Sequence, residues 1–573
     1  MQPQIPQLAT FSEGSGGESR RPDTLSVRMS VQTATKATPI SSRSSQSATV
    51  RSALWAAWGD ALGFPAEMAS ERMLQQRLDA ADPDGLPGSW SRRIGGRMGP
   101  TVDLPAGCTS DDTQLRLAVA RCIRTTGRFD AEAFSKVELP VFLSYQLGAG
   151  RGTKAAAHAL AKRTTRWFSN FFDERTSRYV DCGGNGAAMR IQPHVWAARD
   201  ARPETYLAPL LRDVVCTHGH PRGILGACLH ALALATTLHR SSVPEPDRWA
   251  GMVGHLSEVE HILVSDDALG ERWLPAWEDA ASRSFSKALA ETVMELQHQV
   301  EHAVAAATRV QRGGEDAAHV YSDLVRSLGG LRKETRGAGT TTSVLSLWLA
   351  WAFSSNPIGG LRASSFLINS DTDTISTMAG ALLGVVASDD PPGEVLDRAL
   401  IVYEAQRLDA LAQERPAPSF PHPDPLHWQP PPYLADALGL IDDQPAMAGL
   451  GPVRLLGEPI SGQGDRKEMW QWAVTSYGQT LLTKRRPELQ ELPPGAMPRS
   501  RPSAPTNGNA MESPSPTPHR SQFPDDPANG AEFFLGHRED DRLLGELLRH
   551  YAKQGPTASA VFATLISFRL TDR

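Results

Sequence analysis

Long segments whose apolar residues recur at helical spacing are the strongest constraint on how this chain can fold. They include SALWAAWGDALG, TQLRLAVARCIRT, RGILGACLHALALATTLHR and SVLSLWLAWAF. The first is apolar on most of its faces, as a fully buried helix would be. Alternating strand patterns are scarce between residues 47 and 413. The sequence therefore predicts one large all-α domain whose central helices are buried.

Changes in composition set the expected boundaries of this domain. Residues 1–46 are rich in Ser, Thr, Gln and Pro, which is typical of a disordered tail. The remaining expected segments are a catalytic helical domain over 47–415, a Pro-rich wrap with a small extension over 416–485, a disordered linker over 486–535 and a C-terminal helical segment over 536–573. Within the extension, RKEMWQWAVTSYGQTLLTK is predicted to be a helix. The amphipathic DDRLLGELLRHYAKQG is expected to dock on the main domain, with a protein partner as the alternative.

Charge, hydropathy and cysteine content narrow the class of protein. The formal net charge is -6, which does not indicate a dedicated nucleic-acid binder. The longest apolar run, VLSLWLAWAF, is about half of the roughly 20 residues that cross a bilayer, so no membrane segment is predicted. The five cysteines include no C-x-x-C pair. A disulfide scaffold or thiolate zinc site is therefore not expected, and a cytoplasmic location fits best.

Three segments join acidic residues to Gly, Ser or Thr beside a helical pattern. In WGDALGFPAE, Asp60 alone would be expected to cap a neighbouring turn, and Glu67 to be solvated. In GCTSDDTQL, two adjacent carboxylates precede an amphipathic helix, although one helix N-cap needs only one such residue. The segment NSDTDTISTMAG repeats this arrangement. The acidic residues of the last two segments therefore exceed what helix capping requires.

These two clusters together indicate a metal site. Neighbouring carboxylates repel each other unless a cation or a shared proton compensates. Oxygen ligands without Cys or His suit hard ions such as Mg²⁺, Mn²⁺ or Ca²⁺. An EF-hand loop starting at Asp371 is excluded, because its fifth and twelfth positions hold Ile375 and Leu382. The small residues after the cluster, such as Ala379 and Gly380, predict close helix packing that brings it to its partner.

A D-x-D motif after an apolar segment also suggests a haloacid-dehalogenase phosphatase. That alternative requires a strand before Asp371, a position near the domain start and a distant acidic pair. Here the motif lies near the end of the helical region, and the next acidic pair, Asp389 and Asp390, follows too closely. The phosphatase remains a weak alternative.

The motifs GDALGFPAE, SDDTQL and SDTDTISTMAGALLGV resemble, in order and context, those of the ADP-ribosylglycohydrolases. This family includes the dinitrogenase-reductase-activating glycohydrolase and the ADP-ribosyl-acceptor hydrolases. The glycine-rich GGNGAAMRIQP and the Thr-His segment CTHGHPRGILGA are also similar to family motifs. The resemblance covers roughly residues 48–410.

The resemblance implies an all-α hydrolase that cleaves the glycosidic bond between ADP-ribose and a protein or small-molecule acceptor. It implies two Mg²⁺ or Mn²⁺ ions, whose ligand positions fall on Ser110, Asp111, Asp112, Asp371, Asp373 and Thr374. The positions that shape the substrate pocket fall on Gly184, Asn185, Gly186 and His218. Asp111 or Asp112 is expected to take a proton from water, and Glu67 to polarise or protonate the leaving group.

Two departures from the family pattern leave an alternative open. Ser110 replaces the usual Thr but keeps a hydroxyl ligand. Asn369 and Ser370 replace the usual Gly-Gly pair, although Asn tolerates left-handed backbone better than most residues. A catalytically inactive member that binds ADP-ribose or serves structurally, as among crystallins, therefore remains possible. The sequence does not distinguish arginine, serine, nucleic-acid or small-molecule acceptors.

Overall fold

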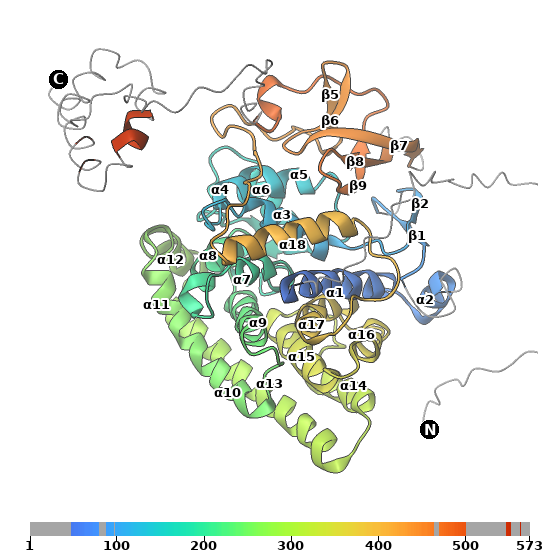
Figure 1. Cartoon of the computed structure of the whole chain (residues 1–573), viewed down its shortest axis with the longest axis vertical. Helices are drawn as coiled ribbons and strands as arrows, with labels where there is room; N and C mark the ends of the chain where they lie inside the picture. The colour runs from blue at the N-terminus through green and yellow to red at the C-terminus, as the bar shows by residue number, and fades with distance from the viewer. Residues whose placement is uncertain are drawn as a thin grey trace, which may run out of the picture. The chain divides into compact units, whose positions relative to one another are not determined.

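The computed structural model describes residues 47–78, 87–96, 98–462, 469–499, 546–551, 558 and 562 (Figure 1). The chain divides into two units, residues 1–500 and 501–573. The tail over 1–46 and most of the predicted linker lie outside the described residues. Residues 546–551 of the second unit are helical, inside the predicted C-terminal helix.

Helices dominate residues 47–413 of the first unit (Figure 1). They are α1 (Ala48–Gly63), α2 (Glu71–Leu78), α3 (Asp111–Cys122), α4 (Ala131–Ala133), α5 (Leu139–Phe142), α6 (Arg151–Leu160), α7 (Gln192–Trp196), α8 (Pro203–Val214), α9 (Pro221–Arg240), α10 (Pro246–Gly254), α11 (Glu258–Val264), α12 (Leu274–Ala281), α13 (Phe285–Gly313), α14 (Ala317–Ser327), α15 (Gly339–Ala352), α16 (Pro357–Ser365), α17 (Thr372–Val386) and α18 (Arg398–Ala412). The 3₁₀ turn η1 (Phe64–Ala66) follows α1 directly. Two short antiparallel hairpins interrupt the helices: β1 (Trp90–Arg93) with β2 (Thr101–Leu104), and β3 (Asp173–Glu174) with β4 (Ser177–Arg178).

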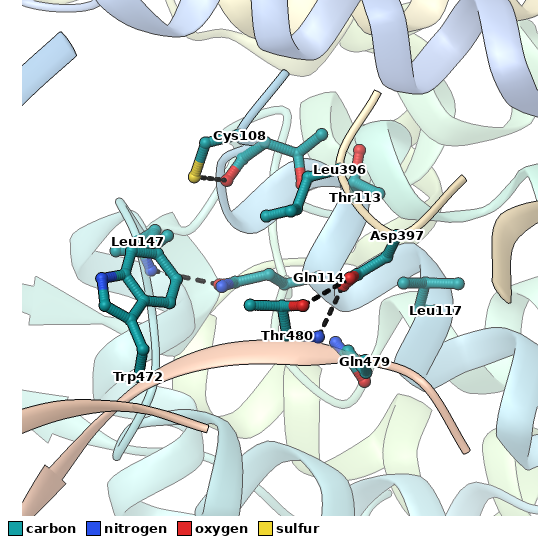
Figure 2. Close-up of a pocket in the computed structure, with 11 residues that line it drawn as sticks. Cys108, Thr113, Gln114, Leu117, Leu147, Leu396, Asp397, Trp472, Gln479 and Thr480 are labelled. Atoms are coloured by element: carbon teal, nitrogen blue, oxygen red, sulfur yellow. Dashed lines mark hydrogen bonds between the residues drawn. The ribbon is translucent and has the colours of Figure 1, made fainter. Parts of the chain in front are cut away.

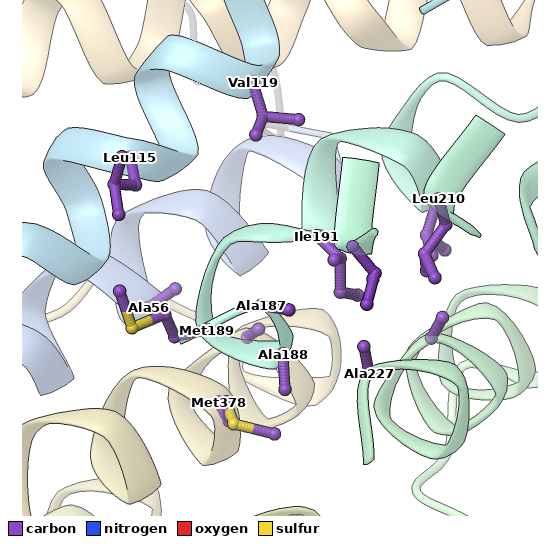
Figure 3. Close-up of a cluster of buried hydrophobic side chains, with 14 of the residues drawn as sticks. Ala56, Leu115, Val119, Ala187, Ala188, Met189, Ile191, Leu210, Ala227 and Met378 are labelled. Atoms are coloured by element: carbon purple, nitrogen blue, oxygen red, sulfur yellow. The ribbon is translucent and has the colours of Figure 1, made fainter. Parts of the chain in front are cut away.

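The core forms where the most apolar helices meet. Figure 3 shows Ala56 of α1, Leu115 of α3 and Met378 of α17 converging on the segment around Ala188. Helix α9 is long and apolar enough to cross a membrane by length and composition, but 83% of its most apolar window is buried inside the fold. It is a core helix, as predicted from its sequence. All five cysteines are buried and free.

Helices α1 and α17 pack with their backbones in direct contact, because glycines line the interface. A Cβ placed on Gly59 would lie 2.3 Å from the Ser376 carbonyl oxygen, and one on Gly380 would lie 2.4 Å from that of Trp55. Such distances leave no room for any side chain. The close packing predicted after the Asp371 cluster is therefore confirmed, and α1 is the helix whose backbone meets that of α17 at Gly380.

The all-α prediction is wrong for the part of the chain after the helical domain. Residues 438–485 form a five-stranded antiparallel sheet in the order β5 (Leu438–Ile441), β6 (Gln444–Met447), β7 (Gly451–Ser461), β8 (Met469–Thr475) and β9 (Thr480–Arg485). The helix predicted over residues 466–484 is instead the β8–β9 hairpin, with residues 466–468 outside the described ranges. Aromatic and β-branched residues favour strands, and Gly478 at φ +98° makes the turn between the two strands.

The Pro-rich segment between the helices and the sheet runs along the helical domain and contributes His422 to a buried ion network. Arg121 at the end of α3 makes two 2.8 Å hydrogen bonds to Glu138, and His422 lies 2.9 Å from the same carboxylate. Burial opposes ionisation of Glu138, but the charge of Arg121 and the hydrogen bonds from Arg121 and His422 together outweigh it and lower the pKa of Glu138 to about 2. Burial also lowers the pKa of His422. Because both pKa values are lower in the folded protein, the unfolded chain binds more protons, and the free energy of unfolding falls as the pH falls.

Replacing Gly380 should show how tightly α1 and α17 are packed. We expect Gly380→Ala to lower stability by about 1–3 kcal/mol, because the methyl group must separate two backbones. The matched control is Gly251→Ala in α10, where a Cβ would meet nothing within 4 Å. That change should be neutral or stabilise by about 0.5–1 kcal/mol, because Ala favours helix over Gly. Thermal unfolding of both variants checks this, and equal melting temperatures would contradict it.

Replacing Glu138 should expose the buried network. Glu138→Gln leaves Arg121 buried without a counter-charge, and we expect a loss of about 3–5 kcal/mol at pH 7. The difference in the free energy of unfolding between the variant and the wild type should narrow as pH falls from about 4.5 towards 2. The wild type then loses the stabilisation that its ionised Glu138 provides. Urea unfolding at pH 7, 5 and 3 measures both effects. Glu301→Gln, at an exposed position on α13, should change neither.

Candidate functional site

A buried carboxylate at the end of α1 positions the start of α3. Asp60 is fully buried. It accepts hydrogen bonds from the backbone N–H groups of Ser110 (2.9 Å) and Thr113 (3.0 Å), and from the Thr113 hydroxyl (2.6 Å). The expectation that Asp60 caps a neighbouring turn is confirmed, and the turn belongs to a helix 50 residues away. This contact brings the SDDT cluster against α1.

The predicted metal residues of α3 lie at its N-terminus. The Ser110 hydroxyl accepts a hydrogen bond from the Asp112 N–H at 3.2 Å, so Ser110 is the N-cap. Asp112 is 1% exposed, and its Oδ2 atom has no hydrogen-bond partner. A Cβ on Gly148 would lie 2.2 Å from Asp111 Oδ1, so the backbone of Gly148 closely approaches that carboxylate.

The predicted metal residues of α17 face the same place. The Thr374 hydroxyl lies 3.4 Å from Asp112 Oδ1, which joins the two clusters across 262 residues. Asp373 Oδ1 accepts the Thr374 N–H at 2.9 Å. Asn369, immediately before the cluster, has φ +74°. The loop therefore forms in the left-handed conformation that Asn was expected to tolerate.

Mutual repulsion shows that these acids share one site. Burial raises the pKa of Asp373 well above its usual value, and the charges of Glu67, Asp112 and Asp371 raise it further. Burial and the charge of Glu67 raise the pKa of Asp111 to about 7. Burial and the charges of Asp60, Asp111 and Asp371 raise the pKa of Asp112 well above its usual value, against the charge of Arg116. A bound cation would remove this repulsion.

The glycine-rich segment adjoins the acidic cluster through Asn185. The Asn185 side chain donates to Asp371 Oδ2 at 3.0 Å and to the Thr342 hydroxyl at 3.1 Å. A Cβ on Gly186 would lie 3.1 Å from the His218 ring, and one on Gly184 would lie 3.8 Å from His218 Nε2. The structure thus brings the predicted substrate-pocket residues beside the predicted metal residues.

His218 is held by a buried polar chain. Its Nδ1 lies 2.7 Å from the Thr217 hydroxyl, which accepts a 2.9 Å hydrogen bond from Arg190, and Arg190 pairs with Asp213. Burial and the nearby charge of Arg190 lower the pKa of His218 to about 3. The imidazole is therefore neutral at physiological pH.

Glu67 stands at the edge of the cluster, just after η1. Its side chain is 22% exposed and pairs with Arg92 of β1 at 3.1 Å. The expectation that Glu67 is solvated is wrong, because the side chain is mostly buried and ion-paired. Burial and the charge of Asp371 raise the pKa of Glu67, against the charge of Arg92. A groove of about 640 Å³ opens beside Glu67, with Arg77, Arg92 and Met73 among its lining residues.

Sequence reasoning missed several residues that shape this site. No pattern in the sequence marks Arg92 as a site residue, because its hairpin is short and its partner, Glu67, lies 25 residues earlier. Gly148 and Gly337 touch Asp111 and Asp371, respectively, where a Cβ would lie within 3.1 Å of a carboxylate oxygen. Gly337 and Gly339 lie on either side of Ala338, the N-cap of α15, and such a glycine pair is a turn signal that could have identified Gly337.

The residues of the acidic cluster fit a hard divalent cation. They supply carboxylate and hydroxyl oxygens, and the buried Asp112 Oδ2 lacks a protein partner. Cys122, Glu138 and His422 also lie close enough together to hold a metal. There, however, Arg121 already occupies both carboxylate oxygens of Glu138. That group is better explained as an ion network.

The segment before Asp371 consists of helix α16 and a turn, so the strand that the phosphatase alternative needs is absent from residues 357–371. No curated protein matches the chain. Among solved structures, 44 chains match. One, described as an ADP-ribosylglycohydrolase-related protein complex, is 19% identical, covers 64% of this chain and 98% of its own, and has a TM-score of 0.38.

The sequence model of the ADP-ribosylglycohydrolase family matches residues 43–413, more than half of the chain. This protein therefore belongs to the ADP-ribosylglycohydrolase family of glycosidase-type hydrolases.

Proposed function

We propose that this protein is a metal-dependent hydrolase that releases ADP-ribose from a mono-ADP-ribosylated acceptor. The observation that carries the proposal is the meeting of two carboxylate clusters with the glycine-rich segment. Thr374 reaches Asp112 across the two clusters, and Asn185 of the GGNG segment reaches Asp371. One site therefore combines oxygen ligands for cations with a backbone suited to a diphosphate.

The metal ligands in this proposal are the six residues named from the sequence, Ser110, Asp111, Asp112, Asp371, Asp373 and Thr374. Two Mg²⁺ or Mn²⁺ ions, when bound, would supply a Lewis acid that orients ribose hydroxyls and makes water easier to deprotonate. Since Ser110 Oγ already accepts the Asp112 N–H, its remaining lone pair is the one available to a cation.

The protein's own groups supply the proton transfers. Cleavage of the glycosidic bond builds positive charge on the ribose C1″ carbon, which nearby carboxylates stabilise. Asp111 or Asp112 takes the proton of the attacking water. Glu67, at the edge of the cluster, delivers a proton to the leaving group or polarises it.

The glycine-rich segment and His218 would bind the rest of the substrate. Gly184 and Gly186 let the backbone approach a diphosphate closely, since neither carries a Cβ. His218 faces both glycines. Being neutral, it offers one N–H donor and one acceptor rather than a charge.

Free ADP-ribose released from arginine-linked and serine-linked mono-ADP-ribosyl peptides tests the proposal. We expect release with Mg²⁺ or Mn²⁺ and none after EDTA treatment. Asp112→Ala or Asp371→Ala should lower kcat by at least about 100-fold, because each removes a charge that orients the reacting groups. Asp200→Ala removes an exposed carboxylate that pairs with Arg202. It serves as the matched control and should leave kcat unchanged.

Two other results would point elsewhere. ADP-ribose binding without turnover on any acceptor would favour the inactive binding or structural family member. Release that survives EDTA would remove the metal from the proposal while leaving the glycosidase in place.

The pH profile tests the assignment of His218. Because its pKa is lowered to about 3, His218 does not titrate between pH 5.5 and 8. We expect His218→Gln to weaken substrate binding and raise KM, while the shape of the kcat/KM profile in that range stays as in the wild type. The loss of a limb from the profile would show that His218 titrates in the working range.

A further inference from the structure

The β1–β2 hairpin connects the C-terminal sheet to Glu67. Arg92 of β1 donates to Glu67 Oε2 at 3.1 Å, and its guanidinium lies 4.6 Å over the ring of Phe64. Phe64 in turn contacts Trp90 edge-to-face, with ring centroids 5.1 Å apart. Arg77 of α2 lies over the other ring, 4.8 Å from the centroid of Trp90. Arg92 is thus fixed by aromatic contacts as well as by its ion pair.

The sheet supplies the other side of this aromatic cluster. Trp470 of β8 is 2% exposed and belongs to the same buried cluster as Phe64 and Trp90. A Cβ on Gly95, in the hairpin turn, would lie 2.4 Å from the Trp470 ring. The turn of the hairpin therefore rests directly on the indole of Trp470.

The sheet is itself fastened to the helical domain. Figure 2 shows Asp397 accepting hydrogen bonds from Thr480 of β9, at 2.7 Å from the N–H and 2.6 Å from the hydroxyl. The Lys484 N–H donates to the Ser144 carbonyl at 2.8 Å. These hydrogen bonds hold the sheet against the helical domain, so Trp470 can act as a fixed support for the hairpin.

These contacts form a continuous path from the sheet to the edge of the acidic site, and every residue of the sheet lies outside the family match over 43–413. We propose that Arg92 is a positioning residue for Glu67, and that the C-terminal sheet, through Trp470, braces the hairpin that carries Arg92. The kinetic part of this inference rests on the proposed hydrolase function. Its structural part does not.

The structural part is tested by hydrogen exchange of the full-length protein. Trp470→Ala should speed amide exchange in the segment over residues 90–104, because the hairpin loses its support. Trp470→Phe keeps a ring under Gly95 and should restore most of the protection. The matched control is Trp428→Ala, which removes a buried Trp from the Pro-rich segment, where its indole donates to the Lys136 carbonyl. Unchanged exchange in Trp470→Ala would overturn the brace.

The kinetic part is tested with Arg92 and Trp470 variants, each made in the wild-type protein and in a Glu67→Gln background. Arg92→Gln and Trp470→Ala should each lower kcat about 10-fold, since small displacements of a catalytic group reduce the rate by this order. The affinity for ADP-ribose, measured by calorimetry, should stay near the wild-type value, because the GGNG segment and His218 lie on other elements. Trp428→Ala should leave kcat unchanged.

In a Glu67→Gln background, neither Arg92→Gln nor Trp470→Ala should lower kcat further, because both act through the carboxylate that is already gone. Losses that multiply in that background would show a general effect on folding and overturn the positioning role. A wild-type protein that releases no ADP-ribose would instead refute the proposed function. The exchange measurement would then decide the brace by itself.

Discussion

The fully buried carboxylate of Asp60 is the contact on which the site depends. It ties the end of α1 to the start of α3 by three hydrogen bonds, and α1 packs backbone to backbone against α17. One acidic cluster begins α3 and the other begins α17, and α1 contacts both helices. Burial raises the pKa of Asp60, against hydrogen bonds from Thr113 and Ser110 and the charge of Arg116. A single buried carboxyl group thus sets the distance between clusters about 260 residues apart.

That arrangement concentrates negative charge in a place where water is largely absent. Asp112 and Asp373 are nearly inaccessible, and the charge of Asp112 raises the pKa of Asp373. Structures that keep such repulsion without a counter-charge lose stability. Local conflict of this kind concentrates at functional sites, where a ligand relieves it. The same carboxylates that weaken the protein alone would bind a divalent cation strongly, so the strain and the proposed metal dependence have one cause.

The sequence predicted the features that are encoded locally. Helical periodicity identified α1, α9, α15 and α17, and the residue types of SDDT and SDTDT identified both clusters. Prediction from the sequence failed where contacts between distant segments determine the structure. The segment predicted as a helix over residues 466–484 has enough apolar residues for a helix, but its described part, from Met469 on, pairs with β7 and forms a hairpin through Gly478. Arg92 and Gly148 contact the site only because of the tertiary fold, and no spacing in the sequence reports such contacts.

The two sides of the site are held by different means, and this difference bears on mechanism. The acidic residues of α3 and α17 start buried helices. Helix α17 packs backbone to backbone against α1, and the N–H groups of Ser110 and Thr113 at the start of α3 donate to the buried Asp60. Glu67 follows a single 3₁₀ turn, and the next residue, Met68, is 71% exposed with φ +51°. Segments with few buried contacts open more easily than helix cores. The side of the site that carries Glu67 is therefore the adjustable side. A brace from outside the family domain, acting on Arg92, would control that side without disturbing the carboxylates of α3 and α17.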